Sequence, residues 1–350
     1  MMNTNIPDRN WQPLPRGEVI ETFANAPFAW GIAGGYAVEQ FIGKAIRDHS
    51  DEEGSMWPSA EVLEAFGVRV VTPLGGRLNQ HWLVAARGER LVLRRWAAPG
   101  DAIAERVGDI DYELRLLARL AARGWPVAPA IAGPVELDGH QWCLFPFLPG
   151  DLPSVADPVA EQRARGRLLA AFHADLSQID GLGQRGDWRR CEEILGDARL
   201  DGVLAAHERE RAEEVHMLRW HLARARERIA NLRPQDRPGM VIHGDFTPWN
   251  LRFQNGQLSG ILDFELAHWD HRIADFALSW RGTYDAVIHG YAEVSPLEPE
   301  EWELLTPMWW ALLIDLASRH LLAGTRDDGW IVKQLLRRSP LMGQDAREFR

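Results

Sequence analysis

The most constraining feature of the chain is the sequence Val-Ile-His-Gly-Asp-Phe-Thr-Pro-Trp-Asn at residues 241–250, which a second motif, Ile-Leu-Asp-Phe-Glu, follows at residues 261–265. The first motif begins with an apolar pair, so we expect a buried strand that ends just before Asp245. Asp245 lies five positions before Asn250, so two oxygen-bearing side chains follow this strand within one short loop. The two motifs therefore predict a site that holds a metal-bound nucleotide and activates a hydroxyl group.

The residues between the two motifs predict a β-hairpin. Asn-Gly at residues 255–256 is a strong two-residue turn signal, and apolar residues flank it on both sides. If this pair forms the turn, counting outward places Asn250 opposite Ile261. Because side chains alternate with period two along a strand, Asp263 is then expected on the same face as Asn250. The two side chains would converge as ligands of Mg²⁺, which needs only one or two protein oxygens.

Both motifs resemble the aminoglycoside phosphotransferase and choline kinase superfamily, which shares its fold with protein kinases. Residues 243–250 are similar to the His-Gly-Asp catalytic loop of that family, and Asp263 matches its second metal-binding motif. Asp275 matches a downstream Asp that braces the loop. The resemblance covers the chain from about residue 68 to the C-terminus. It implies an α+β, two-lobed protein-kinase-like fold with a small antiparallel β lobe and a larger, mainly helical lobe.

The resemblance also suggests how the chain is divided. We expect an N-terminal helical extension, then a nucleotide-binding lobe, then a catalytic and substrate-binding helical lobe, with these bounds: 1–67, 68–148 and 149–350. Part of the extension, residues 30–51, resembles the first helix of aminoglycoside nucleotidyltransferase-like domains. No apolar strand with further carboxylates follows it. We therefore interpret the segment as an extension that packs on the small lobe, and not as a second active site.

The small lobe is predicted to be an antiparallel sheet. Strand-like patterns cover three stretches: 68–72, 80–86 and 91–96. Between the first two lies a turn that contains Gly75 and Gly76, and such a turn lets backbone N–H groups approach a phosphate. Because this turn precedes an Arg-bearing strand, it is similar to the nucleotide-covering loop of the family.

A phosphate-binding cation is expected on the third strand, where kinases place a Lys against the α- and β-phosphates. Arg94 occupies that place in our alignment, which is a departure from the usual Lys, although a guanidinium fork also suits phosphate. A shift of one residue in the strand register would turn Arg95 inward instead. The sequence leaves these two alternatives open.

A helix is predicted at residues 109–123, because Gly124 follows it as a stop signal and its apolar residues recur at helical spacing. Glu113 falls on the apolar face of this helix. A buried charge is costly without a partner, so we expect Glu113 to pair with Arg94. In the family, the equivalent Glu–Lys pair orients the phosphate-binding cation.

An apolar strand runs into a Pro- and Gly-rich connector at residues 141–150, and this connector resembles the family hinge. The backbone from Phe145 to Leu148, including Phe147, is expected to face the adenine. Apolar side chains alone do not establish this assignment, since any buried strand has the same pattern.

Composition limits the remaining functional classes. The net charge of −11 argues against nonspecific binding of nucleic acid. Two cysteines, Cys143 and Cys191, are too few for a disulfide framework and favour a reducing compartment. The start of the chain lacks a basic region followed by an apolar run, and the apolar segment 308–317 contains Asp315, which favours a core helix. We expect a cytoplasmic protein that binds neither nucleic acid nor membrane, and its oligomeric state stays open.

Together these features predict an ATP-dependent phosphotransferase that moves the γ-phosphate to a hydroxyl of a small molecule. Asp245 is the expected base, while Asn250 and Asp263 are the expected ligands of Mg²⁺. The acceptor could be an aminoglycoside, homoserine, a choline-like alcohol or a sugar, and ATP is not distinguished from GTP. A catalytically silent nucleotide-binding module is the alternative, because Arg94 replaces the usual Lys. A transition-metal site at residues 268–271, His-Trp-Asp-His, is disfavoured because no separate cluster supports it.

Overall fold

The computed structural model describes residues 57–76, 79–97, 109–154, 156–186, 188–325 and 329–343. The predicted nucleotidyltransferase-like segment lies outside these residues. The compact unit Leu63–Arg350 holds the sheet and the helices that position the site.

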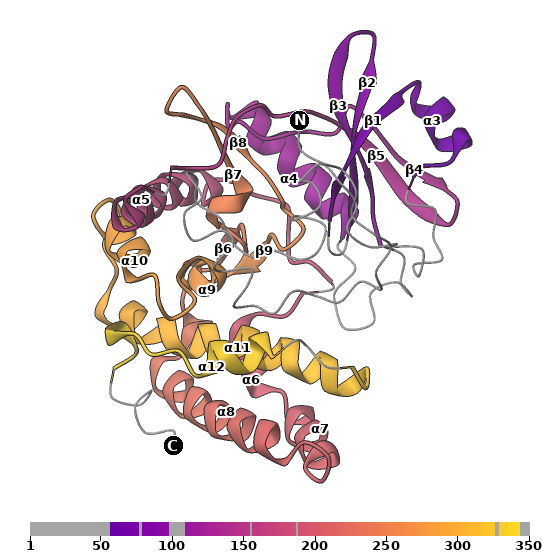
Figure 1. Cartoon of the computed structure of the whole chain (residues 1–350). Coiled ribbons are helices and arrows are strands. Elements are labelled where there is room, and N and C mark those ends of the chain that lie inside the picture. The colour runs from indigo at the N-terminus through magenta and orange to yellow at the C-terminus, as the bar shows by residue number, and fades with distance from the viewer. Residues whose placement is uncertain are drawn as a thin grey trace, which may run out of the picture. The chain divides into compact units, whose positions relative to one another are not determined.

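Five antiparallel strands form the sheet that the sequence predicted, and a short helix, α3 (Ala60–Phe66), precedes them in the chain. The strands follow one another in space as β1-β2-β3-β5-β4 (Figure 1). Their bounds are Arg69–Gly75 for β1, Gln80–Ala86 for β2, Glu89–Arg95 for β3, Ala132–Leu137 for β4 and His140–Pro146 for β5. Strand β3 lies between β2 and β5, so its side chains project from the middle of the sheet. The three predicted strands are therefore confirmed, but β1 continues to Gly75, which was expected in the following turn.

Helix α4 (Ile110–Ala122) has the ends that its sequence predicts. The side chain of Asp109 accepts the N–H of Tyr112 at 2.9 Å and caps the first turn. Gly124 follows the helix with φ 86°, a conformation that glycine adopts at low cost. Glu113 is only 1% exposed on the buried face of this helix.

The remainder of the chain is mainly helical. The helices are α5 (Pro158–Leu176), α6 (Cys191–Gly196), α7 (Arg199–His207), α8 (Ala212–Leu232), α9 (Phe276–Trp280), α10 (Asp285–Ala292), α11 (Pro299–Leu322) and α12 (Trp330–Leu335). Short 3-10 turns occur at Pro234–Asp236, Pro248–Asn250, Arg272–Asp275 and Pro340–Met342. Helix α5 packs against α10, and α11 packs against α8 (Figure 1). Together with the sheet, this arrangement confirms the predicted α+β class.

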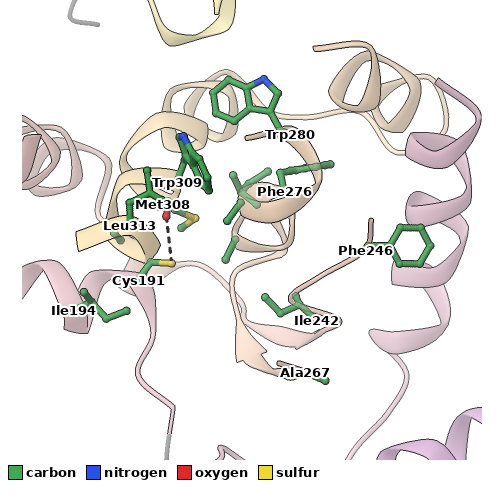
Figure 2. Packing of buried hydrophobic residues seen from close by; sticks show 14 of the residues in the cluster. Cys191, Ile194, Ile242, Phe246, Ala267, Phe276, Trp280, Met308, Trp309 and Leu313 are labelled. Atoms are coloured by element: carbon green, nitrogen blue, oxygen red, sulfur yellow. Dashed lines mark hydrogen bonds between the residues drawn. The ribbon is translucent and has the colours of Figure 1, made fainter. Parts of the chain in front are cut away.

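Helix α11 lies at the centre of the large core. Figure 2 shows Met308 and Leu313 of this helix next to Cys191 and Ile194 of α6. The Sγ atom of Cys191 lies 4.0 Å from the carbonyl oxygen of Met308. The predicted core helix in this region is therefore confirmed. Across the described part of the chain, no helix combines the length and the apolar character that a membrane span requires.

Two short pairs of strands carry the catalytic motifs. Strand β6 (Met240–Ile242) pairs with β9 (His268–Asp270), and strand β7 (Leu251–Gln254) pairs with β8 (Gln257–Ile261) across the predicted Asn-Gly turn. The buried strand expected before Asp245 is thus confirmed as β6. The expected pairing of Asn250 with Ile261 is wrong, because Leu251 pairs with Ile261 instead.

The register shifts by one residue inside this hairpin, between Arg252 and Phe253. Phe253 exchanges two backbone hydrogen bonds with Asp151, at 2.8 and 2.9 Å. The hydroxyl of Ser259 donates to the carbonyl of Pro149 at 2.6 Å and so holds the extra residue of β8 in place. A contact with a distant segment therefore sets the register, and such a contact is invisible to a count along the hairpin.

Candidate active site

The backbone of the catalytic loop is held by Asp275. Its two carboxylate oxygens accept the N–H groups of His243 at 2.9 Å and Gly244 at 2.7 Å. Gly244 has φ 82°, and a Cβ atom there would overlap the carbonyl oxygen of Leu266. Only glycine fits this position without strain. The loop therefore leaves β6 in one fixed direction and delivers Asp245 at its end.

Asp275 is itself fixed by His173 of α5. The Nε2 atom of His173 lies 2.8 Å from Asp275 Oδ2, and its Nδ1 atom lies 2.9 Å from the hydroxyl of Tyr291. Burial by itself would raise the pKa of Asp275, but the hydrogen bond from His173 and the charges of nearby histidines outweigh it and lower that pKa. The loop-bracing role that the resemblance implies for Asp275 is consistent with these contacts.

Asp245 is paired with Asn250 across the loop. The Nδ2 atom of Asn250 donates to Asp245 Oδ2 and to the Asp245 carbonyl, both at 3.0 Å. The other oxygen, Oδ1, is buried without a hydrogen-bond partner among the described residues. Burial raises the pKa of Asp245, and the charges of His243 and Arg281 oppose that shift. A carboxylate with one anchored oxygen and one unpartnered oxygen is suited to accept a proton from a bound hydroxyl.

Asp263 follows β8 in a left-handed conformation, with φ 66°. Asn250 was expected opposite Ile261, but it lies opposite Leu262, whose N–H donates to the Asn250 carbonyl at 2.8 Å. The prediction that strand alternation puts Asp263 on the same face as Asn250 is therefore wrong. Both residues nevertheless line one pocket. Burial, and next the charge of Glu265, raise the pKa of Asp263 well above its usual value. A cation bound here would relieve that destabilised charge, so the residues present fit a divalent metal.

Arg94 and Glu113 form the buried ion pair that the sequence predicted. The distance from Arg94 NH1 to Glu113 Oε1 is 2.6 Å, and the two side chains are 7% and 2% exposed. Burial by itself would lower the pKa of Arg94, but the charges of Glu113 and then Glu265 outweigh it and raise that pKa. Arg94 lines the pocket, whereas Arg95 is half-buried and lies outside that lining. The alternative register that would turn Arg95 inward is wrong.

Glu265 and Asn79 complete this network, and the sequence analysis gave neither of them a role. Arg94 NH2 lies 3.3 Å from Glu265 Oε2, and the amide of Asn79 donates to the same oxygen. The side-chain oxygen of Asn79 in turn accepts the N–H of Ala97 at 3.0 Å. The position of Glu265 two residues after Asp263 was a usable signal, but its contact with β3 is tertiary and leaves no local pattern.

One pocket, of about 580 Å³, collects the predicted nucleotide and metal residues. Its lining includes all of these predicted positions: Gly75, Gly76, Arg94, Glu113, Phe145, Phe147, Asn250 and Asp263. The volume is in the usual range for a small-molecule or cofactor site. Asp245 does not line this pocket itself, but its carboxylate is bonded to Asn250, which does. The arrangement places a cation and two metal-type ligands around one cavity, with the carboxylate of Asp245 one hydrogen bond away.

Side chains from residues 268–271, which the sequence disfavoured as a metal site, form hydrogen bonds to the backbone. The Nδ1 atom of His271 accepts the N–H of Ile273 at 3.2 Å. Asp270 accepts the N–H of His271 at 2.6 Å and that of Cys191 at 3.2 Å. Within the described ranges, no group of three or more His, Cys, Asp or Glu residues is arranged to hold a metal ion. A Mg²⁺ site of two protein ligands completed by phosphate and water does not require such a group.

Comparisons with known proteins agree with this geometry. The sequence model of the phosphotransferase enzyme family matches residues 70–303, which is more than half of the chain. The homoserine kinases of Xanthobacter autotrophicus and Caulobacter vibrioides are 33% and 31% identical to it over 216 and 217 residues. These matches cover 55% and 56% of the chain, and 63% and 65% of the relatives. The chain thus spans a little under two thirds of the length of these relatives.

Solved structures show the same fold. A putative aminoglycoside phosphotransferase from Ralstonia eutropha has a TM-score of 0.56 and 18% identity, and the match covers 83% of this chain and 97% of that one. An ethanolamine kinase from Plasmodium vivax has a TM-score of 0.55 and 12% identity, with 89% and 95% covered. An aminoglycoside phosphotransferase in complex with ADP and hygromycin B has a TM-score of 0.55 and 16% identity, with 78% and 95% covered. The predicted kinase-like fold is therefore confirmed.

Proposed function

The chain belongs to the phosphotransferase enzyme family, and from this premise we propose that it transfers the γ-phosphate of ATP to a hydroxyl group of a small molecule. The convergence of four groups on one pocket carries the proposal. The buried pair of Arg94 and Glu113 lies on the same cavity as Asn250 and Asp263, and Asn250 holds Asp245 at 3.0 Å. A site that only binds a nucleotide does not need the hydrogen bond between Asn250 and Asp245.

In this proposal Asp245 orients the acceptor hydroxyl and takes its proton through the unpartnered oxygen. Asn250 and Asp263 are the residues that would hold Mg²⁺. A bound Mg²⁺ would neutralise charge on the phosphates. Because phosphoryl transfer depends mainly on positioning and charge neutralisation, these three side chains and a phosphate-binding cation are sufficient.

Arg94 is the proposed phosphate-binding cation, and Glu113 orients it. Its Nε atom is buried without a partner among the described residues, while its NH2 atom is shared with Glu265 at a longer 3.3 Å. The looser contact is the one that a phosphate oxygen would replace. The turn at Gly75 and Gly76 would cover the phosphates with backbone N–H groups.

The adenine is assigned to the hinge that follows β5. Phe145 and Phe147 line the same pocket as Arg94, and Pro146 between them has no backbone N–H to offer. After Pro146, the backbone donors of this stretch are those of Phe147 and Leu148. We place the boundary between a nucleotide-binding lobe, 68–148, and a catalytic lobe, 149–350, at this hinge.

The acceptor is proposed to be small. The similarity to homoserine kinases favours a hydroxyl-bearing metabolite over a large antibiotic, although the match covers only part of those relatives. The cytoplasmic location remains a prediction from composition, and it accords with Cys143 and Cys191 being buried free thiols.

ADP release in the presence of Mg²⁺ and ATP tests the proposal. Candidate acceptors are homoserine, choline, ethanolamine, hexoses and aminoglycosides, and ³¹P NMR identifies any phosphate ester formed. The expected result is ADP release that depends on one class of acceptor and yields its ester in equal amount. GTP replaces ATP in a parallel series to settle the nucleotide preference.

The alternative of a silent nucleotide-binding module makes the opposite prediction. Arg94 stands where kinases use Lys, and two carboxylates already engage it. Tight binding of Mg-ATP with no acceptor-dependent turnover across the whole panel would favour that alternative.

A further inference from the structure

The side chain of Arg281 is fixed beside the catalytic loop. Arg281 follows α9 with φ 53°, and its Nε atom donates to the carbonyl of Leu278 at 2.8 Å. Its guanidinium carbon lies 4.6 Å from the ring centroid of Trp249 and 5.8 Å from that of Trp330. Two indole rings and one backbone hydrogen bond therefore hold this cation in one place.

Trp249 connects this cation to the catalytic carboxylate. Trp249 is 45% exposed and lines the nucleotide pocket. Trp249 directly precedes Asn250, whose amide donates to Asp245. Arg281 thus lies over an exposed ring at the rim of the pocket, and its charge acts on Asp245.

The charge of Arg281 is not compensated locally. In the part of the chain that the structure describes, no carboxylate oxygen lies within 4.0 Å of its nitrogens. The groups that act on it are the carboxylate of Asp245, the phenol of Tyr284 and two further arginines, Arg165 and Arg337. Arg165 is paired with Glu161 at 2.8 Å, whereas Arg337 donates to the Arg281 carbonyl at 3.2 Å. Burial also lowers the pKa of Arg281, which is the cost of an unpaired cation.

We propose that Arg281, with Arg337 behind it, binds a carboxylate of the phosphoryl acceptor, so that the acceptor is a small hydroxy acid. The inference rests on the proposed phosphotransferase function and adds the class of its substrate. A guanidinium presents a planar fork that matches a carboxylate through two hydrogen bonds. The free ends of Arg281 supply that fork next to the base, since only its Nε atom is used within the described structure.

The same charges disfavour a cationic acceptor. The net charge of −11 would suit an aminoglycoside, but it is spread over the whole chain. Arg281 lies over Trp249, so an ammonium group placed on that ring would meet its guanidinium. Specificity of this kind comes from repulsion as much as from attraction.

Matched pairs of small alcohols test the inference by calorimetry on the full chain saturated with Mg-ADP. The hydroxy acids are glycolate, 3-hydroxypropionate, 4-hydroxybutyrate and homoserine. Three are compared with the diol in which CH₂OH replaces the carboxylate: ethylene glycol, 1,3-propanediol and 1,4-butanediol. Homoserine is compared with 3-aminopropanol, in which hydrogen replaces it. We expect at least one hydroxy acid to bind roughly 10- to 100-fold more tightly than its partner, as a charge-assisted bidentate contact provides.

Variants assign that preference to one side chain. Arg281→Gln should abolish the preference, Arg281→Lys should keep part of it, and Arg199→Gln, on the exposed surface of α7, should leave it unchanged. Thermal melting confirms that each variant is folded. Equal binding of acid and alcohol in every pair, including no detectable binding of any acid, would overturn the inference, and so would a preference that survives Arg281→Gln.

Turnover separates this inference from the proposed function. Phosphoryl transfer to a neutral or cationic alcohol that Arg281→Gln leaves unchanged would refute the hydroxy-acid substrate and keep the phosphotransferase. A drop in kcat with unchanged acceptor affinity would assign Arg281 to the phosphoryl group instead. Hydroxy-acid binding without any transfer would refute the phosphotransferase.

Discussion

Asp275 accepts the backbone N–H of His243 at 2.9 Å, although the two residues are 32 positions apart in the chain. The contact joins the start of α9 to the end of β6, the strand that delivers Asp245. It is a buried, charged hydrogen bond to the backbone, and the direction of the catalytic loop depends on it.

Replacing Asp275 by Asn should destabilise the protein and misplace the loop. An amide has one acceptor oxygen, so one of the N–H groups of His243 and Gly244 would face an NH₂ group. We expect a loss on the order of 2–4 kcal/mol in the free energy of unfolding, as for breaking a buried charged contact. Urea denaturation measures it. Asp138→Asn is the matched control, because Asp138 is exposed in a left-handed turn where Asn is tolerated. Equal stability of the two variants would show that Asp275 does not brace the loop.

The sequence predicted correctly the features that depend on neighbouring residues, such as helix ends and strand bounds. Helix α4 begins at its Asp109 cap and ends before Gly124, and β2 has the bounds that alternation indicated. The pair of Arg94 and Glu113 followed from one argument, that a charge on an apolar face needs a partner.

What the sequence did not reveal depends on contacts between distant segments. The hairpin register shifts because Phe253 bonds to Asp151, and no pattern within the hairpin signals this. Glu265 and Arg281 acquire their places from β3 and from Trp249, respectively. These positions follow from tertiary packing and not from periodicity or caps.

Arg94 and Arg95 provide a comparison of adjacent, chemically identical side chains. Arg94→Ala should weaken ATP affinity by roughly 2 kcal/mol, the range of charge-assisted hydrogen bonds, while Arg95→Ala should have little effect. Arg94→Lys should restore most of the affinity. Nucleotide titration of the three variants measures this. Equal small losses for both alanine variants would remove Arg94 from phosphate binding.

Removing Mg²⁺ and removing the side chain of Asp263 should lower the thermal stability of the ATP-bound protein equally. We expect Asp263→Ala to abolish the additional thermal stabilisation that Mg²⁺ gives with ATP, because the anionic ligand is lost. EDTA should have the same effect on the unmodified protein and no effect on the variant. Glu265→Gln, two residues away, is the control and should retain the dependence on Mg²⁺. A variant that still responds to Mg²⁺ would contradict the assignment of Asp263.

His271 should make the protein less stable in mild acid. Burial lowers its pKa from 6.5 to about 4, against the opposing charges of Glu301 and Asp270. The unfolded chain therefore takes up this proton at a higher pH than the folded protein does. The stabilisation is complete above pH 6.5 and is lost as the pH falls toward 4.

A matched variant isolates this contribution. His271→Asn keeps an acceptor for the N–H of Ile273 but does not titrate. Between pH 7.5 and 4.5 the unmodified protein should lose on the order of 2 kcal/mol more unfolding free energy than the variant. Parallel pH profiles for the His271 variant and the unmodified protein would refute the role of His271.

The most direct measurement is single-turnover transfer of the γ-phosphate by Asp245→Asn, with the best acceptor of the panel and saturating Mg-ATP. Loss of a positioned acid–base group should slow transfer by a factor on the order of 10² or more while ATP binding is kept. Asp138→Asn should transfer at the rate of the unmodified protein. Unchanged transfer by Asp245→Asn would contradict the account, because the acceptor would then lose its proton without the carboxylate of Asp245.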